Sequence, residues 1–564
     1  PYTTLFRSGV APVLAPQSSV MGEIMFISLQ VDTMSATTPR TSLQQLRTLA
    51  EWTVKPAILA TGGVSQVSII GGERRQYQVL ADPVRMHAYG VTLHDLEQVA
   101  ATFGANAPAG MVRDYGNEYT LCGVIRTSDI DAMGQSLVKM CDGRPVSLSD
   151  VADIVVGHEV RIGTASSNAN PSVILSVSKQ PDVNTLHVTR QIDSNLAAVR
   201  QSLPSDVHMD THVFRQADFI AASVGNVSRA LIEGALFVVL ILLLFLGSFR
   251  STVISLIAIP LSLLGTVLCL YLLDMEINTM TLGGMCIAIG SLVDDAIIDV
   301  ENVYKHLRRN HQLPPDQRRS AYQVVFQGSS EIRGSIMHAT IIIMLCFMPL
   351  FFLSGLEGRM LKPLGIAYII SLFTSLLVAM TVTPLLCKSL LSDSRYLERR
   401  QREPWLTIQM QILYRRILTW VLQHKRPVLY ATVLLLLMSV GLLATVGRGF
   451  LPEFNEGSLT IAMVAQPGIS LDESDRLGQL AERQLLAVPE VVSTARRTGR
   501  GELDEHSQAT NGTEIEVSFR LDRRGKQAFL DEVRARLSTI PGTSVSIGQP
   551  LSHRIEHMVS GTQA

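Results

Sequence analysis

The chain has 564 residues, of which 47% are hydrophobic and only 17% carry a charge. A soluble protein usually carries charge on about a quarter of its residues, so this composition predicts a membrane protein. The formal net charge of −1 gives no sign of the basic surface that nucleic-acid binding requires. We therefore expect no nucleic-acid partner.

The first part of the chain is predicted to lie outside the membrane. Pro1–Ser8 continues no pattern found downstream, and we interpret it as a non-native start that precedes a first extramembrane subdomain at residues 9–70. Residues 71–160 follow as an inserted subdomain, in which a helix begins at Thr92 with Asp95 in capping-box spacing. The many turns of this insertion favour a docking role over a catalytic one.

Residues 161–229 are expected to complete the first subdomain with a strand, a helix and a second strand. The strands are predicted at Val173–Val177 and Val207–Val213. The helix is predicted to run from Thr185, its expected cap, to about Leu203. This order predicts a subdomain of mixed helix and sheet.

Six hydrophobic segments are each about 20 residues long, enough for a helix to cross a bilayer. Five of them lie within residues 230–390 and the sixth lies within residues 428–447. In chain order the predicted spans are Ala230–Phe249, Ser251–Leu273, Thr279–Ile298, Ile336–Leu356, Leu364–Cys387 and Val428–Val446. None of them contains a Lys or an Arg, so we expect any basic partner of an intramembrane acid to come from a part of the protein outside this chain.

Basic residues concentrate in two of the connections between the predicted spans. These connections, Glu301–Arg333 and Lys388–Arg426, are therefore expected to be cytoplasmic. With six alternating spans, Pro1–Arg229 and Arg448–Ala564 then lie together on the opposite side of the membrane.

Between the fifth and sixth spans, residues 391–427 are expected to form a cytoplasmic linker. Its segment Pro404–His424 mixes apolar and polar residues at helical spacing, which is typical of an amphipathic helix on a membrane surface. A soluble linker helix would have the same pattern and stays open as the alternative.

The last part of the chain, residues 448–564, repeats the order of the earlier subdomain. Strands are predicted at Leu459–Ala465, Val491–Ala495, Glu514–Phe519 and Thr543–Ile547, with helices at Leu471–Ala487 and Lys526–Thr539. Strand–helix–strand–strand–helix–strand is the split βαβ, ferredoxin-like pattern. Gln180-Pro181 and Gln466-Pro467 occupy corresponding places before and after the spans, which indicates duplicated halves.

Asp294 and Asp295 are adjacent within the third predicted span. Each ionised acid at membrane depth costs roughly 2.5–3.5 kcal/mol, and two neighbours also repel, so at least one is expected to hold a proton readily near neutral pH. Such a group is what a proton-driven transporter needs. Asp299 lies one turn beyond Asp295 and is a candidate extension of the proton path. Glu301 lies toward the cytoplasmic end, where it can reach water.

Other interpretations apply to the same residue types. One alternative is that the acid pair is structural and that a basic residue on another helix neutralises it. An intramembrane aspartyl protease also uses embedded acids, but it needs them on two facing helices, and these share one. His553–His557 matches the H-x-x-E-H pattern of some zinc proteases, yet Ser560-Gly561 cuts short the helix that this site needs. We interpret it as a surface or cleft segment, in which His557 and Met558 make at most transient metal contacts.

Cys122 and Cys141 lie outside the spans, so they are the candidates for a disulfide in an oxidising compartment. Whether they pair stays open. The other four cysteines lie in the spans and are expected to be small packing residues. No spacing of Cys and His indicates a zinc site.

Gly283–Asn302 resembles the fourth membrane helix of the resistance-nodulation-division (RND) efflux permeases. Phe450–Gly457 supports this resemblance, and Gln466–Gly468 and Ser552–Gly561 resemble the heavy-metal-efflux branch in particular. The resemblance covers essentially Gly9–Ala564. Since the members of this family carry further membrane helices, it implies that the chain is a fragment of a permease.

The resemblance implies an α+β membrane protein with a transmembrane helix bundle, six spans of which lie in this fragment. Ferredoxin-like split βαβ porter subdomains and an inserted docking subdomain would lie outside the membrane. It implies a secondary active transporter of the bacterial inner membrane rather than an enzyme, with no cofactor. Such permeases form homotrimers, join a periplasmic adaptor protein and an outer-membrane channel, and exchange protons for the exported substrate.

By the same resemblance, Asp294 and Asp295 match the proton-carrying acids of the family. Glu301 matches the family's acid toward the cytoplasm. The lysine partner of these acids in the family lies in a helix outside the matched region. The resemblance therefore leaves the basic partner of the pair outside this chain.

The substrate implied by the resemblance is a metal cation or a small toxic compound. Divalent-metal exporters carry a further Asp where this chain has Ala288. Copper and silver exporters carry methionines where Leu292, Asp299 and His557 align, and Met280 does match one of their methionines. The double Asp is more similar to the drug-exporting branch. A drug exporter and a non-transporting membrane sensor therefore stay open as alternatives.

Overall fold

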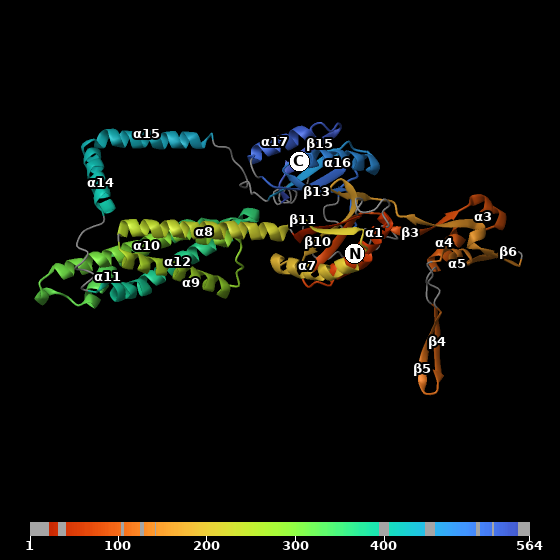
Figure 1. The fold of residues 1–564 in the computed structure, drawn as a ribbon, viewed down its shortest axis with the longest axis horizontal. Helices are drawn as coiled ribbons and strands as arrows, with labels where there is room; N and C mark the ends of the chain where they lie inside the picture. The colour runs from red at the N-terminus through yellow and green to blue at the C-terminus, as the bar shows by residue number, and fades with distance from the viewer. Residues whose placement is uncertain are drawn as a thin grey trace, which may run out of the picture. The chain divides into compact units, whose positions relative to one another are not determined.

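The computed structural model describes residues 22–31, 41–102, 107–123, 129–141, 143–246, 248–393, 405–445, 457–502, 508–521 and 524–550. These residues belong to two compact units. One combines Pro1–Phe219 with Glu453–Ala564, and the other is Ile220–Pro452. The first unit mixes helices and strands, whereas the second is helical (Figure 1).

The N-terminal half of the first unit is a four-stranded antiparallel sheet with the strand order β11-β1-β10-β2. Its elements are β1 (Glu23–Val31), α1 (Leu43–Leu49), η3 (Ala50–Val54), α2 (Lys55–Leu59), β2 (Val64–Gly71), β10 (Asn170–Lys179), α7 (Thr185–Ser202) and β11 (Val207–Arg215). The predicted strand–helix–strand is confirmed in β10, α7 and β11, and the structure adds an equivalent β1–helix–β2 before them. The predicted cap of α7 is wrong. Asn184 is the cap, because its side chain accepts a hydrogen bond from the His187 amide at 3.1 Å.

The C-terminal half of the first unit has the same arrangement, with the strand order β13-β14-β12-β15. Its elements are β12 (Ser458–Ala465), α16 (Leu471–Leu486), β13 (Val491–Gly499), β14 (Gly512–Phe519), α17 (Lys526–Leu537) and β15 (Thr543–Gly548). All six elements are those predicted, with ends that differ by a few residues. They form because alternate strand residues such as Leu459 and Ile461 are buried against helix residues such as Ala481 and Phe529.

The two halves share one sheet, although the predicted spans separate them in the sequence. Strand β9 (Gly163–Ser167) forms a hairpin with β10 and also pairs antiparallel with β13, where Ser167 lies opposite Ala495. The result is a nine-stranded sheet built from both ends of the chain.

The insertion begins and ends with two paired strands, β3 (Arg75–Ala81) and β8 (Ala152–His158). Between them lie α3 (Pro83–Tyr89), α4 (Leu93–Thr102), β4 (Ala107–Asp114), β5 (Asn117–Gly123), α5 (Ile130–Gly134), β6 (Leu137–Cys141), β7 (Arg144–Ser147) and α6 (Leu148–Val151). The capping box is confirmed, because Thr92 and Asp95 each accept a hydrogen bond from the other's amide, at 3.2 and 2.8 Å. The β4–β5 hairpin was not predicted.

Cys141 is a free thiol, which answers the open question of a disulfide with Cys122. Its Sγ–H donates a hydrogen bond to the carbonyl oxygen of Tyr89, 2.9 Å away. The structure therefore shows no disulfide at Cys141.

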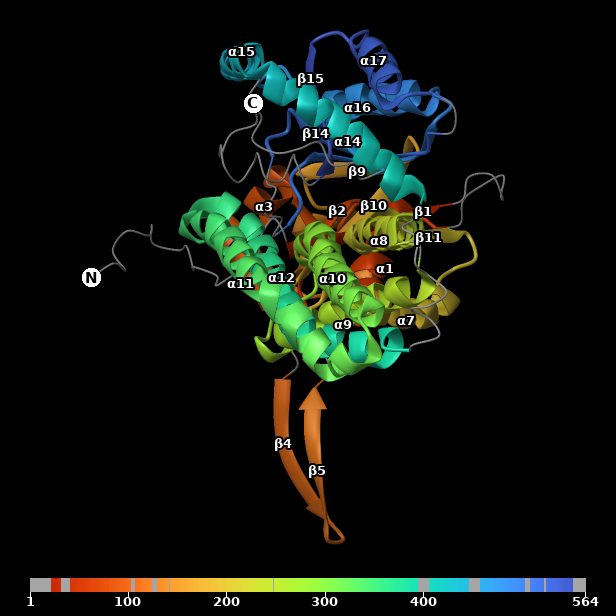
Figure 2. The same cartoon turned by 90° about the vertical axis from the view of Figure 1, so that its left-hand side faces the viewer.

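The second unit contains helices that are long and apolar enough to cross a membrane. In the described part of the chain these are α8 (Gln216–Leu246), α9 (Phe249–Leu272), α10 (Thr279–Gln312), α11 (Ala321–Phe347), α12 (Gly355–Leu391) and α15 (Lys425–Leu443). The linker helix is also found, as α14 (Trp405–Gln423). Figures 1 and 2 both show α9, α10, α11 and α12 side by side.

The predicted end of the fourth span at Leu356 is wrong. Helix α11 ends at Phe347, and a 3-10 turn, η5 (Met348–Phe352), follows. Pro349 lacks a backbone N–H and cannot continue an α-helical hydrogen-bond ladder. Gly355, whose φ is +75°, begins the next helix, so Leu356 belongs to α12.

Helix α10 packs closely on α12 through Gly284. A Cβ atom at this position would lie 2.4 Å from the carbonyl oxygen of Leu364 and 3.2 Å from Cβ of Ala367. Small residues allow such close approach between membrane helices. This contact fixes which side of α10 faces α12, and with it the direction of the acidic side chains.

Candidate functional site

The candidate site is the acidic segment of α10. Asp299 follows Asp295 by four residues, so it lies about 40° around the helix and about 6 Å farther along the axis. In the structure Asp294 is exposed, Asp295 is half-buried and Asp299 is only 3% exposed. The described helices therefore enclose Asp299 and leave the face that carries Asp294 uncovered.

Asp299 lies in a small cavity of about 10 Å³. Its other lining residues come from α11 and α12: Ser329, Arg333, Ile336, Leu376, Ala379 and Met380. Neither carboxylate oxygen of Asp299 accepts a hydrogen bond. A buried acid whose oxygens accept no hydrogen bond is costly to ionise, and acids within membrane helices are candidates for function.

Arg333 corrects one expectation about the membrane helices. The sequence placed it at the end of a cytoplasmic connection, because the apolar window begins three residues later at Ile336. The structure places it inside α11, which begins at Ala321, and in the cavity with Asp299. A guanidinium N–H of Arg333 donates to the hydroxyl of Ser329 over 3.5 Å. The second unit therefore contains a basic group, Arg333, beside one of its membrane-helix acids, Asp299.

Sequence reasoning missed Ser329 and Arg333 as neighbours of the acids. The only sequence signal was the interval of one helical turn between these two residues, which places both on one face of α11. Nothing in the sequence says that this face meets α10 at Asp299.

Glu301 lies outside the buried cluster. It forms an ion pair with Lys305 on the next turn of the same helix, with 2.7 Å between Oε1 and Nζ. Their side chains are 47% and 55% exposed. Glu301 is therefore exposed in the structure and paired within its own helix.

Met280, a predicted substrate residue, is not brought to the acids. Met280 lies in the first turn of α10, about 21 Å along the axis from Asp294 at 1.5 Å per residue. His557, Met558 and the H-x-x-E-H pattern lie outside the described residues. Within the described ranges, no group of three His, Cys, Asp or Glu side chains is arranged to hold a metal ion.

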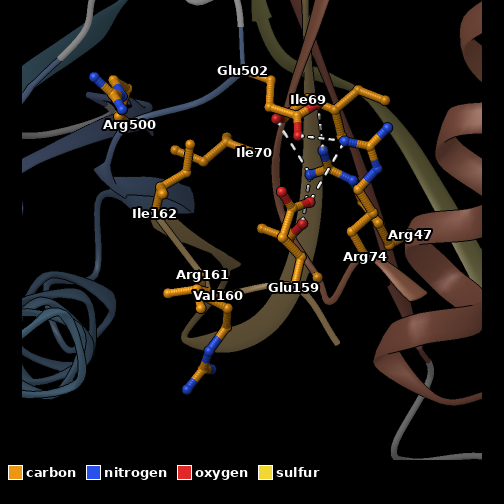
Figure 3. A pocket seen from close by; sticks show the side chains of 13 residues that line it. Arg47, Ile69, Ile70, Arg74, Glu159, Val160, Arg161, Ile162, Arg500 and Glu502 are labelled. Carbon is orange, nitrogen blue, oxygen red and sulfur yellow. Dashed lines mark hydrogen bonds and ion pairs between the residues drawn. The ribbon is translucent and has the colours of Figure 1, made fainter. Parts of the chain in front are cut away.

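A second pocket lies in the first unit, beside the point where the insertion leaves the sheet (Figure 3). Its volume is about 60 Å³. It is lined by Arg47, Ile69, Ile70, Gly71, Gly72, Arg74, Glu159, Val160, Arg161, Ile162, Gly163, Arg500 and Glu502. In Figure 3, Arg161 and Arg500 lie apart from the other charged side chains.

Arg74 is surrounded by acids in this pocket. Arg74 forms ion pairs with Glu502 at 2.9 Å, Glu51 at 3.3 Å and Glu159 at 3.5 Å. Glu502 and Glu51 raise the pKa of Arg74, whereas burial lowers the pKa of Arg47. Since Arg74 and Glu159 flank the insertion and Glu502 belongs to the C-terminal half, this cluster joins three parts of the first unit. It is a structural ion-pair cluster rather than an open ligand site.

Comparisons with known proteins place these observations in one family. Residues 3–564 match the sequence profile of the AcrB/AcrD/AcrF family. The chain is 26% identical to the cation efflux system protein CzcA of Alcaligenes sp. (strain CT14), over 99% of this chain and 53% of that protein. It is 27% identical to the cation efflux system protein CusA of Escherichia coli (strain K12), with the same shares covered. The chain spans about half the length of the curated relatives it matches.

The fold is also similar to a solved structure. The match is to the X-ray structure of a heavy metal efflux pump in crystal form I, with a TM-score of 0.80 and 25% sequence identity. It covers 97% of this chain and 52% of that one. Both the sheet unit and the helical unit therefore have counterparts in that pump.

Proposed function

Because the chain belongs to the AcrB/AcrD/AcrF family of RND permeases, we propose that it is part of the inner-membrane subunit of a proton-driven efflux system that exports metal cations. The relatives named above are described as cation or heavy metal efflux proteins. The observation that carries the proposal is the acidic segment of α10, which lies within a helix long enough to cross the membrane.

In this proposal Asp294 and Asp295 carry the protons. An ionised carboxylate at membrane depth is costly, and binding a proton removes that cost. The two charge states therefore favour different packing of α10 against its neighbours, which is the differential interaction that a conformational switch needs. Asp299 extends the path inward, and Glu301 exchanges protons with the cytoplasm.

The sheet unit supplies the route for the substrate. We assign its two four-stranded halves as ferredoxin-like porter subdomains and residues 71–160 as the docking subdomain, on the periplasmic side of the bacterial inner membrane. The full-length protein would form a homotrimer and meet a periplasmic adaptor protein and an outer-membrane channel. The equal strand order of the two halves supports this assignment.

A second candidate substrate is an organic compound. The adjacent acids Asp294 and Asp295 are more similar to the drug-exporting branch, and Ala288 stands where divalent-metal exporters carry an Asp. These positions favour an exporter with a broad substrate specificity. The assignment of metal cations as substrate rests on the relatives, and the alternative of an organic substrate rests on these residues.

Everted membrane vesicles that contain the full-length protein test the proposal. An imposed pH gradient should drive accumulation of Zn²⁺ or Cu⁺, and Asp295→Asn should reduce it to the background of empty vesicles because the proton-binding group is lost. Asp316→Asn is the matched control, since Asp316 is an exposed acid in the turn between α10 and α11. Full gradient-driven uptake by the Asp295→Asn protein would exclude the proton role, and uptake of organic cations alone would replace the metal assignment.

A further inference from the structure

Asp299 is the most deeply enclosed acid of α10. Its side chain is 97% removed from solvent, and neither oxygen accepts a hydrogen bond. The cavity beside it is about 10 Å³, which is close to the smallest space that holds one water molecule. An acid in this setting binds a proton or meets a counter-charge across that cavity.

The counter-charge is present on the facing helix. Arg333 lines the same cavity, and it is held there by its hydrogen bond to Ser329, one turn away on α11. From α12, Cys387 is the titratable side chain close enough to interact electrostatically with Asp299. Within the described residues that line the cavity, Arg333 is the one positive group that faces Asp299.

We propose that Arg333 is the positioning residue for Asp299, and that the two form a second proton-binding site in the membrane domain, separate from the Asp294–Asp295 pair. In the ionised state the guanidinium attracts the carboxylate across the cavity. When a proton binds the carboxylate, the attraction is lost, and Arg333 rests on Ser329. In the structure both Asp299 oxygens are unpartnered and Arg333 donates to Ser329, which is the arrangement that this proposal assigns to the protonated state.

The inference rests on the proposed proton-driven function, but it adds a basic partner within this chain. The pair is distinct from the ion pair of Glu301 and Lys305, which is solvent-exposed and lies on a single helix. Because Asp299 and Arg333 stand on α10 and α11, a change of charge at Asp299 alters the attraction between two membrane helices. That is the coupling a proton-driven movement requires.

The full-length protein in proteoliposomes provides the test. The carboxylic-acid C=O band of Asp299 is identified in the infrared spectrum as the band that Asp299→Asn removes, and its intensity is followed against pH. With Arg333→Gln, the protonated fraction of Asp299 at neutral pH should rise, and the pH profile of transport should move to higher pH by about one unit, because a nearby opposite charge is lost. Arg333→Lys keeps the charge and should keep the profile.

Two further variants keep the test decisive. Arg309→Gln removes an exposed arginine from α10 and should leave both readouts unchanged. In an Asp299→Asn background, Arg333→Gln should produce no further movement of the pH profile, because the group it acts on is gone. An Asp299 band that is insensitive to Arg333→Gln, or a shift that persists in the Asp299→Asn background, would overturn the proposal.

The infrared readout separates this proposal from the proposed function. If the Asp299 band responds to Arg333→Gln in a protein that transports nothing under a pH gradient, the positioning role stands and the transport function fails. If transport is proton-driven but the band does not respond, the transport function stands and the positioning role fails.

Discussion

The two units bury charge in opposite ways. In the sheet unit, Arg496 is fully buried and meets Glu482 at 3.0 Å and Asp475 at 2.9 Å, and it also donates to Ser166 of β9 at 3.1 Å. Its neighbour Arg497 is paired just as fully, with Glu514 at 2.5 Å, Glu23 at 3.3 Å and the ring of Phe26 at 4.2 Å. Every one of these acids has a cation within ion-pair distance.

The helical unit contains the opposite case. Asp299 is as buried as the acids of the sheet, but its oxygens have no hydrogen-bond partner. Paired buried charges lock an architecture in place, because separating them exposes an uncompensated charge. An acid whose oxygens accept no hydrogen bond does not lock the packing in this way. The comparison therefore indicates a structural role for Arg496 and Arg497, and it supports the proposed role of Asp299 in proton binding.

The largest expected effect comes from breaking the paired network. Arg496→Met leaves Glu482 buried without a cation, and we expect the sheet unit to lose about 3–5 kcal/mol of unfolding free energy. Denaturant-induced unfolding measures it. Arg476→Met is the control. Arg476 lies on α16, is exposed, and pairs with Glu473 at the surface. A loss no greater than that of Arg476→Met would contradict the structural role.

A smaller effect is expected from an exposed acid that stabilises by capping. Asp82 is the cap of α3, and hydrogen bonds from the Arg85 amide, the Arg85 side chain and the Val84 amide lower its pKa below the usual 3.8. Because the folded-state pKa is depressed, this contribution is complete above about pH 4 and is lost as the pH falls through the folded-state value. Hydrogen exchange of α3 amides against pH should follow this loss.

Asp82→Asn sharpens that measurement. The amide oxygen keeps a cap acceptor but does not titrate in this range. The acid-dependent increase in exchange of α3 should therefore disappear in this variant. An unchanged pH dependence would assign the effect to another group of the insertion.

The smallest expected effect is that of Asp299→Asn on the stability of the helical unit. Asp299→Asn replaces an acid whose oxygens accept no hydrogen bond in the structure, so the thermal stability of the helical unit should stay within about 0.5 kcal/mol of the parent, or increase. Thermal unfolding in detergent measures it. A loss as large as that of Arg496→Met would mean that Asp299 is a structural acid, and the distinction between the two units would fail.

The sequence predicted those features that depend on local pattern. Hydropathy identified the membrane helices, and alternation in strands with helical spacing between them identified all six elements from β12 to β15. The same patterns predicted the ends of helices less accurately. Asn184 and Thr185 are both acceptable cap residues, and Pro349 sits within an apolar run whose hydropathy continues past the end of α11.

The sequence by itself therefore predicted a membrane protein, the six elements of the C-terminal half of the sheet unit and the acids of α10, because periodicity and composition act over a few neighbouring residues. Only the tertiary structure decided that β9 pairs with β13, that Asp299 is enclosed while Asp294 is exposed, and that Arg333 meets Asp299. A periodic pattern says that a face is buried, but it does not say which partner covers it. That choice is made by packing between segments far apart in the chain, as at Gly284 against Leu364.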